Sequence, residues 1–386
     1  MTLSTPLLAA APLLAGLMGP ALIGAAAPGP WQAAPAPAGP PVHHYQTRRP
    51  AAGPLAGRTS SGPASPPPGP ASGHVVEHVA ARTTAEQRRV LDYWTPERMA
   101  NALPIGLLDL VTGGDLLGGL TGRPRPAAAF PRLGAVPVVP ALAASAPRGP
   151  QAARAPRSGT VGARWGAGGA VARTTGRVFM TVNGADFVCS ASTVRSASRD
   201  VVVTAGHCVK DGTGQWAQNW TFVPGYGTRG SHPYGRYAAR RMFVTGPWAR
   251  RADDDYDIGM VALATWGGRH VTDVVGGQDI AFNAPRGGQA YGFGYPADPP
   301  YRGDRLVYCA GRLRDDPYKQ SRDQGLGCAM TAGSSGGPWL TGFDPASGRG
   351  RITSLSSFKY TDDPRTMYGP YFGAIARALF DTARRG

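Results

Sequence analysis

The order of three short segments, which carry a histidine, an aspartate and a serine, constrains this chain more than any other feature. His207 lies in Thr204-Ala205-Gly206-His207-Cys208, at the end of a β-branched run. Asp257 opens an apolar run, and Ser335 lies within Gly333-Ser334-Ser335-Gly336-Gly337-Pro338. A serine hydroxyl needs a neighbouring base to act as a nucleophile, imidazole titrates near neutrality, and an aspartate can orient the imidazole. Together the three segments predict a Ser-His-Asp hydrolase.

The same order argues against two other hydrolase folds. The serine segment fits the G-x-S-x-G pattern of α/β-hydrolases, but that fold places its histidine after the serine, and the last histidine here is His270. The subtilisin order needs an aspartate before the histidine, and neither Asp186 nor Asp200 lies in a suggestive context. Taken singly, each segment also fits a structural role: a surface histidine, a solvated acidic loop or a flexible turn.

A metal site is the alternative for the acidic run. Asp253, Asp255 and Asp257 are spaced like the start of an EF-hand loop, which also needs a glycine at its sixth position and a glutamate at its twelfth. Those positions hold Ile258 and Ala264. We therefore expect no metal ligand here and no cofactor.

These segments resemble those of the chymotrypsin-like (trypsin-fold) serine peptidases, within them the bacterial secreted branch similar to the glutamyl endopeptidases. The resemblance covers roughly residues 160–386 and includes Ile352-Thr353-Ser354-Leu355-Ser356, which looks like the family strand that pairs with the substrate backbone. We accordingly expect Ser354, Leu355 and Ser356 to bind substrate. Tyr93-Trp94-Thr95-Pro96-Glu97-Arg98-Met99 resembles prosegments of secreted actinobacterial peptidases of this type.

Short strands between glycines and prolines predict an all-β catalytic domain. We expect two antiparallel six-stranded β-barrels, roughly residues 160–285 and 286–386, with the active site in the cleft between them. His207 and Asp257 would lie in the first barrel and Ser335 in the second. The glycines around Ser335 let the backbone turn tightly, so we expect the amides of Gly333 and Ser335 to form an oxyanion hole.

The expected specificity pocket departs from the trypsin pattern. Trypsin-type enzymes hold an acidic residue six positions before the serine, where this chain has Ala329, followed by the bulky Met330. Ser334 replaces the aspartate that pairs with a new N-terminus in trypsin-like zymogens, and Thr353 aligns near the histidine of glutamate-specific pockets. A buried charge without a partner is costly. We therefore expect Ala329 and Met330 to bind small or medium apolar residues, unless a donor such as Ser354, Ser356 or a nearby arginine reaches a carboxylate.

The four cysteines form two pairs with the same separation, Cys189 with Cys208 and Cys309 with Cys328. No C-x-x-C pair exists, so a zinc site is poorly supported. Two disulfides in an exported protein are expected, with a fully reduced set as the alternative. The resemblance independently implies Cys189–Cys208, which would anchor the histidine.

The residues before the catalytic domain divide by composition into four parts. Residues 1–27 resemble a signal peptide, because an apolar stretch precedes Ala25-Ala26-Ala27. Residues 28–73 are Pro- and Ala-rich and predicted to be disordered, residues 74–121 form a short prosegment, and residues 122–159 a linker. Val75, Val76, Val79, Val90 and Leu91 fit a helical period in the prosegment.

The sequence has 40 basic and 24 acidic residues, a formal net charge of +16, but no nucleic-acid recognition motif. The apolar N-terminal stretch is interrupted by Pro12 and Pro20, which disfavours a membrane anchor. We predict a monomeric, secreted, extracellular serine endopeptidase that is made as a precursor, acts on proteins or peptides and binds no nucleic acid. The alternative is a non-catalytic peptide-binding protein that retains the fold.

Overall fold

The computed structural model describes residues 74–105, 159–360 and 362–386. The predicted signal peptide, the Pro- and Ala-rich stretch, the end of the prosegment and nearly all of the linker lie outside the described residues. Strands dominate the described part, which confirms the predicted all-β fold. No helix in these ranges is long and apolar enough to cross a membrane.

The first barrel is a closed antiparallel sheet of six strands. These are β4 (Thr175–Val182), β5 (Ala185–Thr193), β6 (Val201–Thr204), β7 (Gln218–Pro224), β8 (Tyr237–Thr245) and β9 (Gly259–Leu263). The sheet closes because β9 pairs with both β6 and β8. Asn183 and Gly184 join β4 to β5 and both have positive φ, as a two-residue hairpin turn requires.

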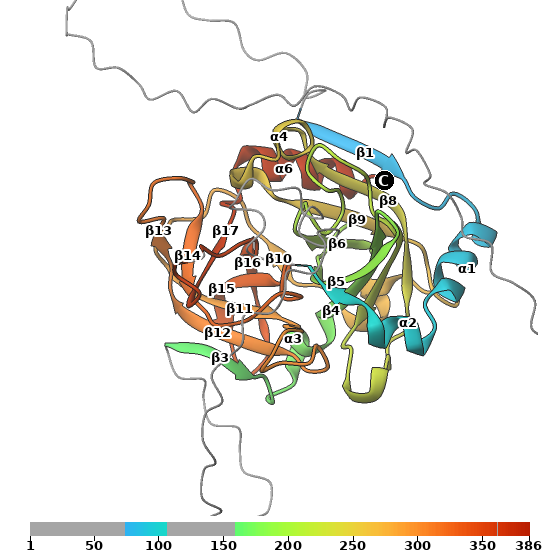
Figure 1. Cartoon of the computed structure of the whole chain (residues 1–386), viewed down its shortest axis with the longest axis horizontal. Coiled ribbons are helices and arrows are strands. Elements are labelled where there is room, and N and C mark those ends of the chain that lie inside the picture. The colour runs from blue at the N-terminus through green and yellow to red at the C-terminus, as the bar shows by residue number, and fades with distance from the viewer. Residues whose placement is uncertain (1–73, 106–158, 361) are drawn as a thin grey trace, which may run out of the picture. The chain divides into compact units, whose positions relative to one another are not determined.

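The second half consists of two sheets. The larger contains β10 (Asp279–Ile280), β16 (Arg349–Leu355), β15 (Pro338–Asp344), β11 (Gln289–Gly294), β12 (Val307–Arg312) and β3 (Thr160–Arg164). The smaller contains β13 (Arg314–Asp315), β14 (Gln324–Gly327) and β17 (Thr366–Gly369). Their side chains share a core around Trp339, Leu326 and Met367. In Figure 1 these strands are the orange and red ones, with the green β3 at their edge.

Two short strands lie on the other side of the boundary expected near residue 285. β3 pairs with β12, and β10 pairs in parallel with β16, so both belong to the second half. β10 and β3 are the two edge strands of the six-stranded sheet. Each pairs with backbone groups that would otherwise be free, β10 with those of β16 and β3 with those of β12.

Short helices connect and cover the strands. They are α3 (Gly169–Thr174), η1 (Thr228–Gly230), α4 (Gly246–Arg251), η2 (Asp254–Tyr256), α5 (Val271–Val275) and the C-terminal α6 (Ala374–Ala383). Both predicted disulfides are formed, Cys189–Cys208 and Cys309–Cys328.

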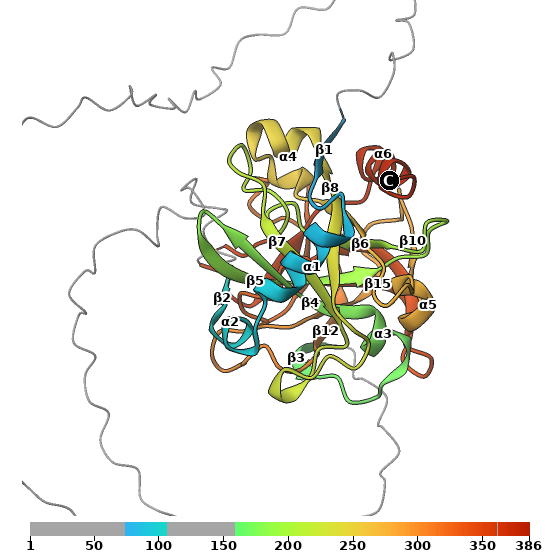
Figure 2. The same cartoon turned by 90° about the vertical axis from the view of Figure 1, so that its right-hand side faces the viewer.

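Residues 74–105, here called the N-terminal arm, pack on the first barrel. They comprise β1 (Val75–Val79), α1 (Thr84–Tyr93), α2 (Pro96–Asn101) and β2 (Leu103–Pro104). The helical period expected for Val75, Val76 and Val79 is wrong, because these residues form a strand. β7 pairs only with the start of β8, so the edge from Arg241 to Thr245 is free to pair with β1. Figures 1 and 2 show the blue β1 beside β8.

Trp94 is the main apolar anchor of the arm. The side chain is 1% exposed, its ring centroid lies 5.4 Å from that of Phe179, and its indole N–H donates to the Asn219 carbonyl at 2.6 Å. Arg236 donates to the Leu91 and Trp94 carbonyls at 3.2 and 2.9 Å. Side-chain caps from Thr83 and Thr95 begin the two helices on either side of Trp94.

Trp94→Ala tests whether this anchor holds the arm. In the uncleaved chain carrying Ser335→Ala, we expect Trp94→Ala to lower the free energy of unfolding by about 3–5 kcal/mol, as is typical when a buried tryptophan is removed. Hydrogen exchange should become faster in residues 75–105, while β4 to β6 keep their protection. Leu103→Ala, at a side chain 48% exposed, is the control. Unchanged exchange in Trp94→Ala would contradict the anchor role.

Candidate active site

The ends of two paired strands bring His207 and Asp257 together. β6 ends at Thr204, whose partner on β9 is Gly259, so the loop after β6 meets the turn before β9. Asp257 Oδ1 accepts the His207 backbone N–H at 2.8 Å, and Oδ2 lies 2.8 Å from the ring Nδ1. Both side chains are buried. The carboxylate thus fixes both the backbone and the ring of the histidine.

Gly206 is required by this close approach. A Cβ at this position would lie 2.9 Å from Asp257 Oδ1 and 2.8 Å from Trp248 Cδ1. Any side chain would therefore displace the aspartate or the indole. Trp248 is held in place by its ring N–H, which donates to the Lys210 carbonyl at 2.9 Å.

Ser357 is a site residue that the sequence analysis missed. Its hydroxyl donates to Asp257 Oδ2 at 2.5 Å and is buried. The sequence analysis singled out Ser354 to Ser356 instead. Ser354 donates to the Pro370 carbonyl, and Ser356 accepts a hydrogen bond from Trp339. The sequence held one signal for this role, because Ser357 is a further serine directly after Ser356.

Leu355 and Met330, two of the expected substrate-binding residues, have fully buried side chains. Leu355 is part of the main hydrophobic core, and Met330 packs in the second-half core. Ala329 lies near the surface of that core and donates its N–H to the Val161 carbonyl. The structure therefore brings neither Leu355 nor Met330 to an exposed surface.

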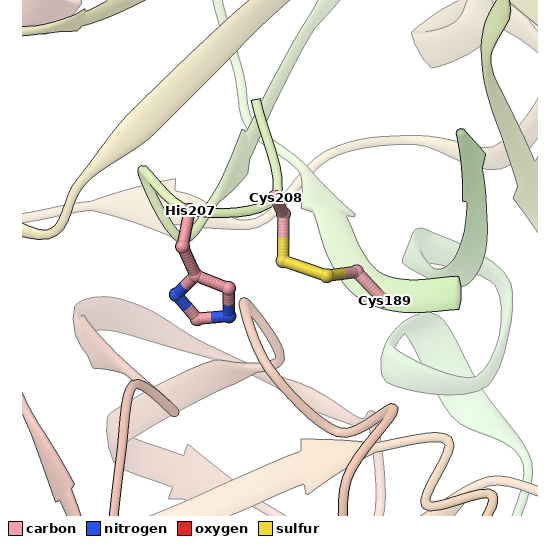
Figure 3. A group of neighbouring side chains, drawn as sticks. All are labelled: Cys189, His207 and Cys208. Carbon is pink, nitrogen blue, oxygen red and sulfur yellow. A yellow bond between two sulfur atoms is a disulfide. The ribbon is translucent and has the colours of Figure 1, made fainter. Parts of the chain in front are cut away.

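Ser335 lies in the loop that precedes β15. Its carbonyl accepts the Ser190 N–H at 2.7 Å and lies 3.7 Å from Cys208 Sγ. A ring nitrogen of His207 lies within 4.8 Å of both sulfurs of the Cys189–Cys208 disulfide. Figure 3 shows the His207 and Cys208 side chains leaving one loop on the same side. The disulfide thus joins β5 to the histidine loop, and the Ser335 carbonyl lies close to it.

The expected hydrogen bonds of the three residues are partly present. The 2.8 Å between His207 Nδ1 and Asp257 Oδ2 is a hydrogen-bond distance. The Ser335 hydroxyl and His207 Nε2 are buried and have no hydrogen-bond partner among the described residues. Such bonds are often long before substrate binds.

The loop before Ser335 leaves two backbone amides without a carbonyl acceptor among the described residues. Gly333 has a φ of +90°, and a Cβ there would lie 3.0 Å from the Tyr295 carbonyl oxygen. Within the described ranges, the Gly333 and Ser335 amides donate to no carbonyl. The preceding residues are fixed by Ala297, whose N–H donates to the Ala332 carbonyl at 2.7 Å. Two amides next to the hydroxyl are thus free for an oxyanion.

Metal ligation fits these side chains poorly. Cys189 and Cys208 lie close to His207, but their sulfurs are joined and are not thiolates. In the acidic run, Asp253 pairs with Arg251 and Asp255 with Arg322. The carboxylates of the D-x-D-x-D motif are thus engaged in separate interactions.

Burial shifts two carboxyl groups beside Asp257. The pKa of Asp254 is raised to about 7, first by burial and then by Asp257 and its other acidic neighbours. Burial also raises the pKa of Asp323 well above its usual range, together with Asp255 and Asp254. Neither Asp323 carboxylate oxygen accepts a hydrogen bond from the described residues. A raised folded-state pKa contributes stability that is fully present below the unfolded-state value of 3.8 and is lost as pH rises from there through about 7.

Asp254→Asn tests this linkage in the Ser335→Ala background, which prevents autolysis. At pH 8 we expect the melting temperature to rise by about 2–4 °C, equivalent to about 1 kcal/mol, because partial solvent contact reduces the effect. At about pH 3 the variant and the parent should melt together, since Asp254 is then protonated in both the folded and the unfolded state. Asp253→Asn is the control for net charge. An equal shift at both pH values would refute the linkage.

Comparisons with known proteins agree with this architecture. The family model for trypsin matches residues 167–369, more than half of the chain. The protease Anisep from Arthrobacter nicotinovorans is 39% identical, with a TM-score of 0.53, over 55% of this chain and 96% of that one. The thermostable serine protease AL20 from an extremophilic microorganism is 42% identical, with a TM-score of 0.53, over 56% of this chain and 99% of that one.

A shorter match involves the extracellular metalloprotease of Bacillus subtilis (strain 168). It is 38% identical over 64 residues, 17% of this chain and 20% of that protein. The match thus spans a fifth of that relative's length. With the family match and the two solved structures, the chain belongs to the trypsin family of serine proteases.

Proposed function

We propose that the protein is a secreted serine endopeptidase, with Ser335 as nucleophile, His207 as general base and Asp257 as the residue that orients the base. The observation that carries this proposal is the double hydrogen bond from Asp257 to His207. A carboxylate on Nδ1 favours the tautomer that carries its proton there, so Nε2 remains an acceptor. The unpartnered Ser335 hydroxyl is the group that would donate to it.

The reaction follows from these positions. His207 Nε2 takes the Ser335 proton as Oγ attacks the peptide carbonyl, and the Gly333 and Ser335 amides stabilise the oxyanion. The protonated imidazole gives its proton to the leaving amine, which leaves an acyl-enzyme. Water, deprotonated by His207, then hydrolyses the ester. Asp257 and Ser357 stabilise the imidazolium throughout, and the residues described supply each step without a cofactor.

Export and processing are supported by other features. Two disulfides suit an oxidising compartment, and one relative is named as an extracellular protease. The N-terminal arm folds onto the first barrel, which supports the interpretation of these residues as a prosegment. The alternative function, peptide binding without catalysis, is less favoured because none of the three reacting groups is substituted. Labelling with a fluorophosphonate probe separates the two, since only an activated serine reacts.

Three substitutions test the catalytic roles on a peptide substrate. We expect Ser335→Ala to abolish labelling and cleavage, and Asp257→Asn to lower kcat about 10⁴-fold. Ser357→Ala should lower kcat about 10- to 100-fold, the usual cost of a hydrogen bond to a charged group. Ser347→Ala is the matched control, because Ser347 donates to the Asp344 carboxylate in an exposed turn. Full activity of the Asp257→Asn variant would contradict the proposed mechanism.

N-terminal sequencing of the secreted active species tests processing. Exposed linkers attract proteolysis, so the expected mature start lies between about residues 150 and 170. The structure favours a cut before Thr160, since β3 begins there and pairs with β12. The Ser335→Ala protein should remain uncleaved if processing is autocatalytic. An active species with residues 74–105 still covalently attached would contradict this prediction.

A further inference from the structure

A cavity of about 430 Å³ lies where the first barrel meets the second half of the protein, and none of the three catalytic side chains lines it. Its wall is formed by the end of β3, by η1 in the connection from β7 to β8, and by the segment that precedes β12. Asp304 is the one acidic residue in the lining. Four of the eleven lining residues are arginines, and they define what is here called the arginine pocket: Arg164, Arg229, Arg302 and Arg305.

The positive charge of the arginine pocket is not compensated by neighbouring side chains. All four arginines are exposed, and none of them forms an ion pair with a described residue. Guanidinium groups stay protonated in proteins, and like charges that share one cavity repel each other. A bound anion would remove this repulsion, so the lining favours a negatively charged ligand.

A fifth arginine, Arg177, is buried directly behind the wall of the pocket. It is 6% exposed, its Nε has no hydrogen-bond partner among the described residues, and its Cζ lies 5.1 and 5.2 Å from the ring centroids of Phe179 and Tyr226. A Cβ on Gly303, which lines the pocket, would lie 2.8 Å from that Cζ. Burial lowers the pKa of Arg177, and Tyr226 and Asp304 oppose this effect. Asp304 therefore already acts on a buried cation.

The loop that carries two of the four arginines has a fixed backbone. The Tyr301 N–H donates to the Asp298 carbonyl at 2.9 Å, and the Gly303 N–H donates to the Pro296 carbonyl at 2.8 Å. These two bonds close the loop on itself before any ligand is bound. A preformed loop lowers the entropy cost of ordering a binding site, so this part of the pocket is ready to receive a ligand.

We propose that the arginine pocket binds an oligophosphate, a short chain of phosphate groups, whose oxygens accept hydrogen bonds from Arg229 of the first barrel and from Arg164, Arg302 and Arg305 of the second half. The planar guanidinium group matches two phosphate oxygens at once, and several arginines around one cavity suit several phosphates. The cavity volume lies within the roughly 300–1,000 Å³ of small-molecule sites. This site is separate from Ser335, and its ligand is not the substrate of the proposed function.

Hydrogen bonds connect the pocket loop to the residues before Ser335. The Asp298 N–H donates to the Thr331 hydroxyl at 3.2 Å, and that hydroxyl donates to the Asp298 carbonyl at 3.0 Å. The Ala297 N–H donates to the Ala332 carbonyl at 2.7 Å. A ligand that orders the pocket loop is therefore expected to order residues 331–334 as well, next to the amides that face the oxyanion in the proposed mechanism.

Isothermal titration calorimetry tests the site in the full chain carrying Ser335→Ala, which excludes both autolysis and turnover. The probes are inorganic triphosphate and orthophosphate at one ionic strength. We expect triphosphate to bind, and orthophosphate to bind at least about 10-fold more weakly, because it reaches fewer guanidinium groups and each hydrogen bond to a charged group contributes about this factor. The affinity for triphosphate should fall as salt is added, since the pocket is open to solvent.

Two double variants of equal charge separate the pocket from the general positive charge of the chain. Arg302→Gln with Arg305→Gln should weaken triphosphate binding about 10- to 100-fold. Arg312→Gln with Arg349→Gln is the matched control and should leave the affinity unchanged. Both control arginines are exposed, lie outside the pocket lining and belong to strands of the same six-stranded sheet.

Hydrogen exchange with and without triphosphate locates the bound ligand. Exchange should slow in residues 226–236, 296–307 and 331–334, whereas α6 should keep its rate. Unchanged exchange in residues 331–334 alone would overturn the connection to the serine loop.

Three results would each overturn the site: no binding of triphosphate to the parent, equal binding of orthophosphate, or equal affinities in the two double variants. Should the pocket variant fail to fold, hydrogen exchange in the parent decides, and unchanged exchange in residues 296–307 would overturn the site. None of these results bears on catalysis, because fluorophosphonate labelling of the wild type tests the proposed function separately.

Discussion

The Asp257 carboxylate is the interaction on which the candidate site depends. It accepts the backbone N–H and the ring N–H of His207 and the hydroxyl of Ser357, all within the protein interior. The three bonds hold two segments from different parts of the chain, the loop that carries His207 and the segment that carries Ser357. A buried carboxylate is stable only when its lone pairs are satisfied. Loss of any partner therefore weakens both the local fold and the orientation of the imidazole.

Other charges near the site lack such compensation. Asp323 is buried and Asp254 is partly buried, and this burial together with the neighbouring carboxylates raises their pKa values. Lys359 is buried with neutral backbone carbonyls as hydrogen-bond acceptors, and burial lowers its pKa. The Asp257 carboxylate accepts three hydrogen bonds, whereas neither oxygen of the Asp323 carboxylate accepts one from the described residues. Perturbed groups of this kind gather at functional sites.

The N-terminal arm depends on a different feature, the unpaired part of β8. β7 covers only the beginning of that strand, and β1 completes the edge. β2 then runs beside Phe187 and Val188 on β5, next to Cys189 of the disulfide. The arm thus contacts the strand that supports the histidine loop. Its removal would expose the edge of β8 and the site of Trp94.

The sequence by itself determined the chemical groups and the fold class. The three segments around His207, Asp257 and Ser335, the cysteine spacing and the strand pattern are local signals, and the all-β fold and both disulfides followed from them. Only the tertiary structure decided which serine reaches Asp257 and that β1 is a strand. Those outcomes depend on long-range hydrogen bonds, such as Gly336 to Ser356 and β1 to β8. A shift of a few residues leaves local composition unchanged but moves each side chain to a new partner.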